Sequence, residues 1–288
     1  MQIVTDSGTD INLSKAEQQE LNVHVVPLNV SLDNVTYLEG VDIQPAEFYP
    51  LLADTEDMPS TSQPSAGEFA DTYRKILEYD QEILSIHISS GLSGTYNSAL
   101  AGAQMLPEAN ITVIDAKTLS AAAGWQVEAA ARAIKNGWAL DKVKDLVERI
   151  SAASDSIYTL NELKYLIHRG RISHMKGLVA SILNIKPIIG VEKEGGTYVQ
   201  MGQVRTFKRA VQRLVNIISD KHPPGSALRV QVLHSYNFEG AAMLKDLIDR
   251  TFECTWLPDG HISLVLGAHT GPSMIGAAYA LQEEFADF

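Results

Sequence analysis

The first half of the chain alternates short apolar runs with stretches in which apolar residues recur every three or four positions. The run 83–88, Ile-Leu-Ser-Ile-His-Ile, predicts a strand that is buried on both faces. Ser65 and Glu68 have capping-box spacing and precede apolar residues at helical intervals, which indicates the start of a helix. This alternation predicts an α/β fold in which helices cover both faces of a parallel sheet.

The same patterns predict elements along the whole chain. In the first half we expect strands over 3–5, 23–30, 35–37, 83–88 and 111–115, and helices over 14–21, 45–52, 65–77, 95–105, 120–136 and 140–150. In the second half we expect strands over 157–158, 186–192, 197–201, 228–234 and 252–256, and helices over 178–183, 205–218, 240–250 and from the last glycine-rich loop to 288. The pattern changes at 151–155, so we expect two domains, residues 1–155 and 156–288.

Three polar loops precede predicted helices. The loops at 6–10 and 89–96 follow strand-like runs, and the loop at 58–65, which contains Thr61, precedes the helix that Ser65 caps. The loop 89–96, Ser-Ser-Gly-Leu-Ser-Gly-Thr-Tyr, contains Ser93 and Gly94 and leads into a helix. Free N–H groups and the dipole at a helix start favour an anion, and glycine lets a ligand approach the backbone. For the loops at 6–10 and 89–96 the alternative is a structural role, in which the polar groups only cap the following helix.

Composition narrows the possible functions. The 288 residues carry 23 Lys and Arg against 35 Asp and Glu, and this net charge of −12 argues against non-specific binding to nucleic acid or anionic membranes. Cys254 is the single cysteine, which excludes an intrachain disulfide and a multi-cysteine zinc site. The chain begins with a strand-like run and no secretory segment, so we expect a cytoplasmic protein.

The window 119–133 is rich in alanine, but it contains Gln126, Glu128 and Arg132. These polar residues indicate a packed helix that is not inserted in a membrane. Small side chains there allow close approach by a neighbouring sheet or helix. A tube for a slender apolar ligand would use the same residues, and both interpretations stay open.

Several polar residues could take part in chemistry, among them His269 in a glycine-bounded loop and Arg171. A serine hydrolase would use Ser93 and His269, but the nucleophile-elbow pattern requires glycine where Thr95 stands. The spacing of His168 and His174 does not suit a metal site, and no P-loop or dinucleotide motif occurs. Hydroxyls, backbone N–H groups, one histidine and one arginine suit a carboxylate that is held and not transformed.

A basic segment opens one predicted helix in the second half and contains Arg205, Lys208 and Arg209. Positive charges at a helix start oppose the helix dipole, so local stability does not explain them. They form either a solvated surface or a docking patch for an anionic partner.

With these loops in place, the chain resembles the DegV family of bacterial fatty acid-binding proteins from end to end. Five motifs in the expected order carry the resemblance: Val4-Thr5-Asp6-Ser7, Thr61-Ser62-Gln63-Pro64-Ser65, the loop 89–96, Leu166-x-x-x-Gly170-Arg171-Ile172 and Gly267-x-His269-x-Gly271-Pro272. The resemblance implies a three-layer α/β/α domain with a parallel sheet, followed by a two-layer α/β domain with a mixed sheet. The ligand is expected between the two domains.

The resemblance also implies how the ligand is held and used. The resemblance implies that the hydroxyls of Thr61 and Ser93 bind the fatty acid carboxylate, that Gly94 belongs to the same site, and that His269 and Arg171 lie nearby. The acyl chain is expected in an apolar tunnel of the first domain. No cofactor or metal is expected. By the same resemblance, a separate ATP-dependent fatty acid kinase is expected to phosphorylate the bound fatty acid for phospholipid synthesis, and the basic segment is its expected docking site. The chain itself is then a carrier and not an enzyme.

Overall fold

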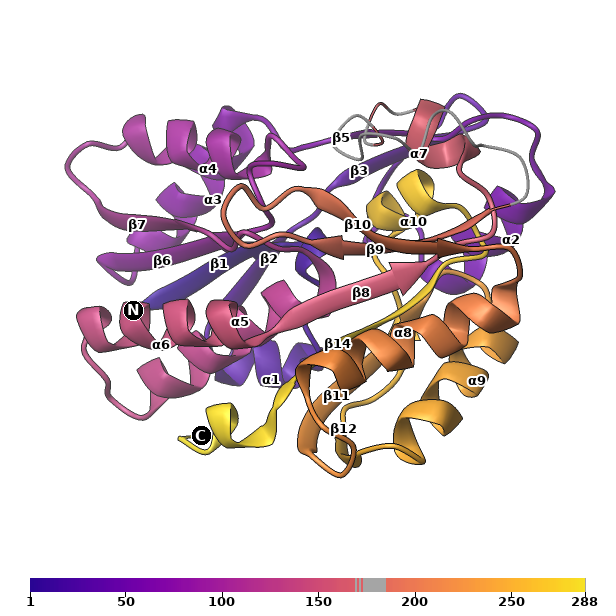
Figure 1. The fold of residues 1–288 in the computed structure, drawn as a ribbon. Coiled ribbons are helices and arrows are strands. Elements are labelled where there is room, and N and C mark those ends of the chain that lie inside the picture. Colours follow the sequence, from indigo (N-terminus) through magenta and orange to yellow (C-terminus); the bar gives the residue numbers. More distant parts are fainter. Residues whose placement is uncertain (169, 171, 173–184, 288) are drawn as a thin grey trace.

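Three β-sheets organise the chain, whose computed structural model describes residues 1–168, 170, 172 and 185–287 (Figure 1). The first sheet has four strands in the order β2-β1-β6-β7, and all neighbouring pairs are parallel. Its strands are β1 (Gln2–Asp6), β2 (Val23–Val26), β6 (Glu82–His87) and β7 (Asn110–Asp115). The parallel sheet predicted from the sequence is therefore confirmed.

Helices cover both faces of the parallel sheet and complete a three-layer α/β/α unit (Figure 1). Successive residues of β1 point to opposite faces, so Val4 packs on the side of α3 and α4 and Ile3 on the side of α5. Ser65 and Glu68 form the predicted capping box at the start of α3. The helices of this unit are α1 (Lys15–Glu20), α3 (Ala66–Leu77), α4 (Thr95–Gln104), α5 (Ser120–Lys135) and α6 (Leu140–Ala153).

A small antiparallel sheet, in the order β4-β3-β5, lies beside the parallel one. Its strands are β3 (Asn29–Leu32), β4 (Val35–Leu38) and β5 (Ser60–Ser62), and helix α2 (Pro45–Asp54) lies between β4 and β5 in sequence. The single strand expected over 23–30 is wrong, because Pro27 has no N–H with which to continue the ladder of β2. The segment expected as a loop around Thr61 contains β5, which pairing with β3 orders.

The third sheet is mixed and has seven strands, six of them in the order β10-β9-β8-β14-β11-β12, with β13 beside β11. Only β12 and β13 run parallel to their neighbour β11. The strands are β8 (Asp155–Thr159), β9 (Lys186–Val191), β10 (Tyr198–Val204), β11 (Ala227–His234), β12 (Glu253–Trp256), β13 (Gly260–His261) and β14 (Ile275–Leu281). The helices of this half are α7 (Lys164–His168), α8 (Phe207–Lys221), α9 (Phe238–Asp249) and α10 (Leu264–Thr270). The hairpin predicted around Gly195 and Gly196 joins β9 to β10.

The helix expected at the end of the chain is wrong. Residues Ile275–Leu281 form β14, which lies inside the mixed sheet and is antiparallel to both β8 and β11. All its residues except the last are buried, so the strand lacks the polar–apolar alternation that marks a half-exposed strand. At Gly276 a Cβ atom would lie 2.6 Å from the carbonyl oxygen of Ile157, so the close pairing requires glycine.

The central strands of the mixed sheet are buried on both faces, by α8 and α9 on one and by the first half of the chain on the other. The edge strands β10 and β12 are partly exposed. Along β14, Ala277 and Tyr279 pack toward the two helices, whereas Ala278 and Ala280 point toward α5. Helix α5 therefore lies between two sheets (Figure 1), and its small side chains permit that close packing. The contribution of α5 to a ligand tunnel stays a prediction.

Two further expectations concern the domain boundary and one helix of the second half. The expected domain boundary, between residues 155 and 156, falls after the first residue of β8, and it stays a prediction. The helix expected over 178–183 lies outside the described residues. Among the helices that the structure describes, none is long and apolar enough to cross a bilayer.

Candidate functional site

Thr61, Ser93 and His269 come from three distant parts of the chain and line one cavity of about 40 Å³. Thr61 lies on β5, Ser93 in the loop between β6 and α4, and His269 on α10. The other lining residues are Leu28, Ser62, Gln63, Ile88, Leu92, Leu119, Tyr198, Val265 and Leu266. The cavity therefore has hydroxyl and imidazole groups on one part of its wall and apolar side chains on the rest.

Thr61 and His269 are in direct contact. Thr61 pairs with Val30 of β3, and its Oγ1 atom lies 3.0 Å from the Nε2 atom of His269. The sequence pattern predicted His269 in a loop, but it lies in the last turn of the buried helix α10, which ends at Gly271 with φ of 76°. Gly271 terminates the helix because a left-handed φ is easily reached only without a Cβ atom.

Ser93 lies just before helix α4, where its hydroxyl contacts the first helical residue. Its Oγ atom is 2.8 Å from Thr95 Oγ1 and accepts a hydrogen bond from Thr95 N at 3.3 Å. Gly94 is the N-cap residue, and a Cβ atom there would lie 2.7 Å from the side-chain nitrogen of Gln63. The two polar loops predicted from the sequence are therefore packed against each other at Gly94.

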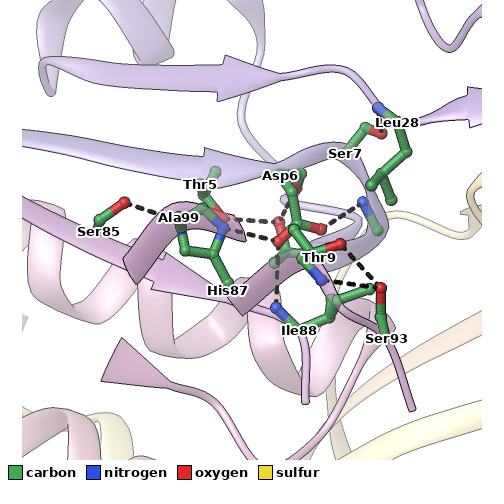
Figure 2. Close-up of polar contacts among 12 residues, drawn as sticks. Thr5, Asp6, Ser7, Thr9, Leu28, Ser85, His87, Ile88, Ser93 and Ala99 are labelled. Atoms are coloured by element: carbon green, nitrogen blue, oxygen red, sulfur yellow. Dashed lines mark hydrogen bonds and ion pairs between the residues drawn. The ribbon is translucent and has the colours of Figure 1, made fainter. Parts of the chain in front are cut away.

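Asp6 has the structural role that the sequence analysis kept open as an alternative. It is fully buried, and its carboxylate accepts hydrogen bonds from Gly8 N at 3.0 Å and Ile88 N at 3.1 Å (Figure 2). Its Oδ2 atom also lies 2.9 Å from the Nδ1 atom of His87, a residue that the sequence analysis did not single out. Asp6 thus ties the end of β1 to the end of β6.

His87 continues this network to Ser85, whose Oγ atom lies 2.7 Å from His87 Nε2 (Figure 2). Ser85, His87 and Asp6 have the connectivity of a hydrolase triad. All three side chains have zero exposure, so no substrate can reach them. We interpret this network as structural.

The other predicted residues are either outside the described part of the chain or exposed on its surface. Arg171 and His174 fall outside the described residues, and His168 is exposed at the end of α7. The basic residues Arg205, Lys208 and Arg209 are all exposed around the start of α8, as predicted for a surface segment. Within the part of the chain that the structure describes, no group of three or more His, Cys, Asp or Glu side chains could hold a metal ion.

A second, more apolar cavity of about 30 Å³ adjoins the first. The two share Leu119, Tyr198 and Leu266 in their walls. The second cavity lies between the start of α5 and the inner face of the mixed sheet, and its remaining lining residues are Ser120, Ser156, Ile157, Tyr158, Leu233, Thr270, Met274, Gly276, Ala277 and Ala278. The polar groups of the first cavity, Thr61, Ser93 and His269, therefore lie next to the apolar wall of the second.

Glu39 is a buried residue near this site that no sequence pattern indicated. Its carboxylate accepts hydrogen bonds from Ser7 Oγ at 2.6 Å, from Ser263 Oγ at 3.2 Å and from Leu264 N. Burial raises the pKa of Glu39 to about 7, because a charge is poorly solvated there. No motif surrounds Glu39, so only its hydrogen bonds to the start of α10 reveal its position.

Comparison with known proteins identifies the relatives of this chain. The family model described as "Uncharacterised protein, DegV family" matches residues 1–282. The chain belongs to the DegV family. A DegV domain-containing protein of Staphylococcus aureus strain N315 is 34% identical over 274 residues, which cover 95% of this chain and 96% of the relative. A DegV domain-containing protein of Halalkalibacterium halodurans is 31% identical over 282 residues, 98% of each chain.

Solved structures of DegV proteins have the same fold. A DegV family protein from Thermus thermophilus, described for its fatty acid binding, has a TM-score of 0.86 and 29% identity over 97% of this chain and 99% of its own. DegV of Bacillus subtilis, described as a fatty acid binding protein, has a TM-score of 0.85 and 26% identity over 98% and 99% of the two chains. The family and the fold class inferred from the sequence motifs are both confirmed.

Proposed function

We propose that this protein binds a long-chain fatty acid, with the carboxylate between the hydroxyls of Thr61 and Ser93 and beside His269. The observation that carries the proposal is that these three side chains, distant in sequence, line one cavity, and that a more apolar cavity shares part of its wall. The fatty acid binding described for the DegV proteins of Thermus thermophilus and Bacillus subtilis supports the same ligand.

The chemistry of the polar end suits a carboxylate. Hydroxyl groups donate hydrogen bonds to a carboxylate, and hydrogen bonds to a charged group are stronger than those between neutral groups. His269 adds a positive charge when it is protonated, and we expect Arg171 to add another. Gly94 has no side chain, so Gln63, which lines the same cavity, packs directly against the backbone before α4.

The acyl chain would pass Leu119, Tyr198 and Leu266 into the second cavity. The two cavities, about 40 and 30 Å³, hold only a few water molecules each, so a long chain requires these side chains to move apart. Burial of each CH₂ group contributes about 0.8 kcal/mol, which offsets that rearrangement over a long chain.

The contacts of Ser93 and His269 favour a carrier over the hydrolase alternative. The Nε2 atom that a catalytic histidine would offer to serine lies 3.0 Å from Thr61 Oγ1, and Ser93 Oγ is bonded to Thr95. In our proposal the chain transforms nothing itself and needs no cofactor. A separate ATP-dependent fatty acid kinase would phosphorylate the bound fatty acid in the cytoplasm for phospholipid synthesis, docking on the exposed Arg205, Lys208 and Arg209.

Lipid extraction of the purified protein followed by mass spectrometry tests the ligand. We expect a co-purifying long-chain fatty acid, and an empty protein that also resists loading would refute the proposal. Thr61→Ala and Ser93→Ala should each weaken fatty acid binding about 10- to 100-fold, because each removes a hydrogen bond to a charged group, ~1.5–3 kcal/mol. Thr36→Ala is a matched control, since Thr36 lies on the outer strand β4 of the same small sheet and is exposed. Equal affinity of Thr61→Ala and Thr36→Ala would mean that the carboxylate binds elsewhere.

A further inference from the structure

Helix α10 follows β13 in the second half of the chain, yet both its ends are held by residues of the first half. At its start, Leu264 N and Ser263 Oγ donate hydrogen bonds to the carboxylate of Glu39. At its end, His269 Nε2 lies 3.0 Å from Thr61 Oγ1. The position of His269 therefore depends on how the helix is anchored five residues earlier.

The two anchors lie on opposite sides of the small antiparallel sheet. Glu39 follows the outer strand β4, and its N–H donates a hydrogen bond to Leu28 O at 3.0 Å. Thr61 lies on the other outer strand, β5, and β3 runs between them. Two strand spacings are about 10 Å, and the helix rises about 7.5 Å from Leu264 to His269. Helix α10, which contacts β3 and β5, thus has a length that suits the distance between the two outer strands.

Tyr49 of α2 holds the same helix from the side. Its hydroxyl donates a hydrogen bond to Ile262 O at 2.8 Å. A Cβ atom at Gly267 would lie 2.4 Å from the Tyr49 hydroxyl oxygen, so the helix is pressed against this ring. Tyr49 therefore limits sideways movement of α10, while Glu39 holds its start.

The carboxylate of Glu39 is buried, and the groups with which it interacts electrostatically or by hydrogen bonds come from several elements. Besides α10 it contacts Ser7 after β1, and the titratable groups around it are Asp6, Asp10 and Tyr49. A buried carboxylate costs free energy even when donors surround it. Three donors, one just after β1 and two at the start of α10, converge on this one group, so it links the end of the parallel sheet to the helix that carries His269.

We propose that Glu39 is a positioning residue of the head-group site: by holding the start of α10, it keeps His269 beside Thr61, where the carboxylate of the ligand binds. The effect on the ligand rests on the proposed function, whereas the effect on the helix does not. The two parts can therefore be tested separately.

The first test measures hydrogen exchange of residues 262–271 by mass spectrometry in the ligand-free protein. Glu39→Ala should speed exchange in α10 about 10-fold, and Glu39→Gln, which keeps an acceptor for Leu264 N, should stay close to wild type. Glu17→Ala is the matched control, because Glu17 likewise accepts hydrogen bonds from a serine at a helix start, but at α1. Unchanged exchange of α10 in Glu39→Ala would overturn the proposal whether or not a fatty acid binds.

The second test compares affinity for a saturated fatty acid with affinity for the fatty alcohol of the same length. Glu39→Ala should weaken binding of the acid about 10-fold and leave binding of the alcohol nearly unchanged, because only the carboxylate depends on His269. In a His269→Ala background, the same change should have no further effect on the acid. Equal weakening of acid and alcohol, or full additivity with His269→Ala, would overturn the positioning role.

These outcomes are distinct from a failure of the proposed function. A wild-type protein that binds no fatty acid would refute that function, and the exchange of α10 would still decide whether Glu39 holds the helix. Should Glu39→Ala fail to fold, Ser263→Ala removes one donor to Glu39 and the N-cap of α10. It should give a smaller loss with the same preference for the acid, and an equal loss for acid and alcohol would count against the proposal.

Discussion

Substitution of Gly196 by alanine tests how the hairpin between β9 and β10 covers the loop that carries Ser93. Gly196 has φ of +66°, and a Cβ atom there would lie 2.0 Å from Ser89 Oγ. Ser89 cannot simply turn away, because its Oγ atom accepts a hydrogen bond from Gly91 N at 3.1 Å. The hairpin and the loop touch through glycines on both sides, since a Cβ atom at Gly91 would lie 2.3 Å from Gly195 O.

Two physical effects contribute to the expected destabilisation. A left-handed φ costs an alanine about 1 kcal/mol relative to glycine. Overlap with Ser89 adds about 1–3 kcal/mol, as in other overpacked sites. Gly225→Ala separates the two effects, because Gly225 has φ of +85° and no atom within 4 Å of the added Cβ. We therefore expect a loss of about 2–4 kcal/mol for Gly196→Ala and about 1 kcal/mol for Gly225→Ala.

Urea denaturation followed by circular dichroism measures the free energy of unfolding of both variants. Fatty acid affinity should fall in Gly196→Ala and stay unchanged in Gly225→Ala, because only the former displaces the loop that leads to Ser93. Equal destabilisation of the two variants would refute our reasoning, since it would leave only the backbone effect. The packing of the hairpin on the loop would then contribute nothing.

Three further predictions concern the partner, the pH dependence and the excluded activity. Arg205→Ala should leave lipid binding intact and reduce acyl phosphate formation by a purified fatty acid kinase, measured by trapping with hydroxylamine. Arg250→Ala, which changes an exposed arginine of the same half, is the control, and equal rates would reject the docking site. Burial raises the pKa of Glu39 from 4.5 to about 7, so its contribution to stability is full below pH 4.5 and is lost as the pH rises through 7. Thermal unfolding across pH 5 to 8.5 should show a decline on the order of 3 kcal/mol that Glu39→Gln flattens, and parallel curves would contradict this. A serine-reactive phosphonate should not label Ser93 under conditions that label an esterase, and labelling would revive the hydrolase alternative.

Local patterns were sufficient for much of the first half of the chain. The capping box of Ser65 and Glu68 predicted the start of α3, because its hydrogen bonds join residues only three positions apart. The run 83–88 predicted β6 because a strand inside a parallel sheet is apolar on both faces, whichever strands it pairs with. Thr61, Ser93 and His269 were also singled out from the sequence as candidates, because hydroxyl-rich and glycine-bounded segments are visible without a structure. Their role in binding stays a prediction.

The tertiary structure alone decided features that depend on partners far along the chain. Strand β14 has apolar residues on both faces, which is equally compatible with a buried helix, and only its pairing with β8 and β11 makes it a strand. Helix α10 is short, and its anchors Glu39 and Thr61 lie more than 200 residues away in sequence. The sequence therefore determined which groups could bind a carboxylate, whereas long-range packing determined that they meet in one cavity. The physical reason is that hydrogen bonds within a turn depend on neighbouring residues, but the meeting of distant elements depends on the burial of the whole core.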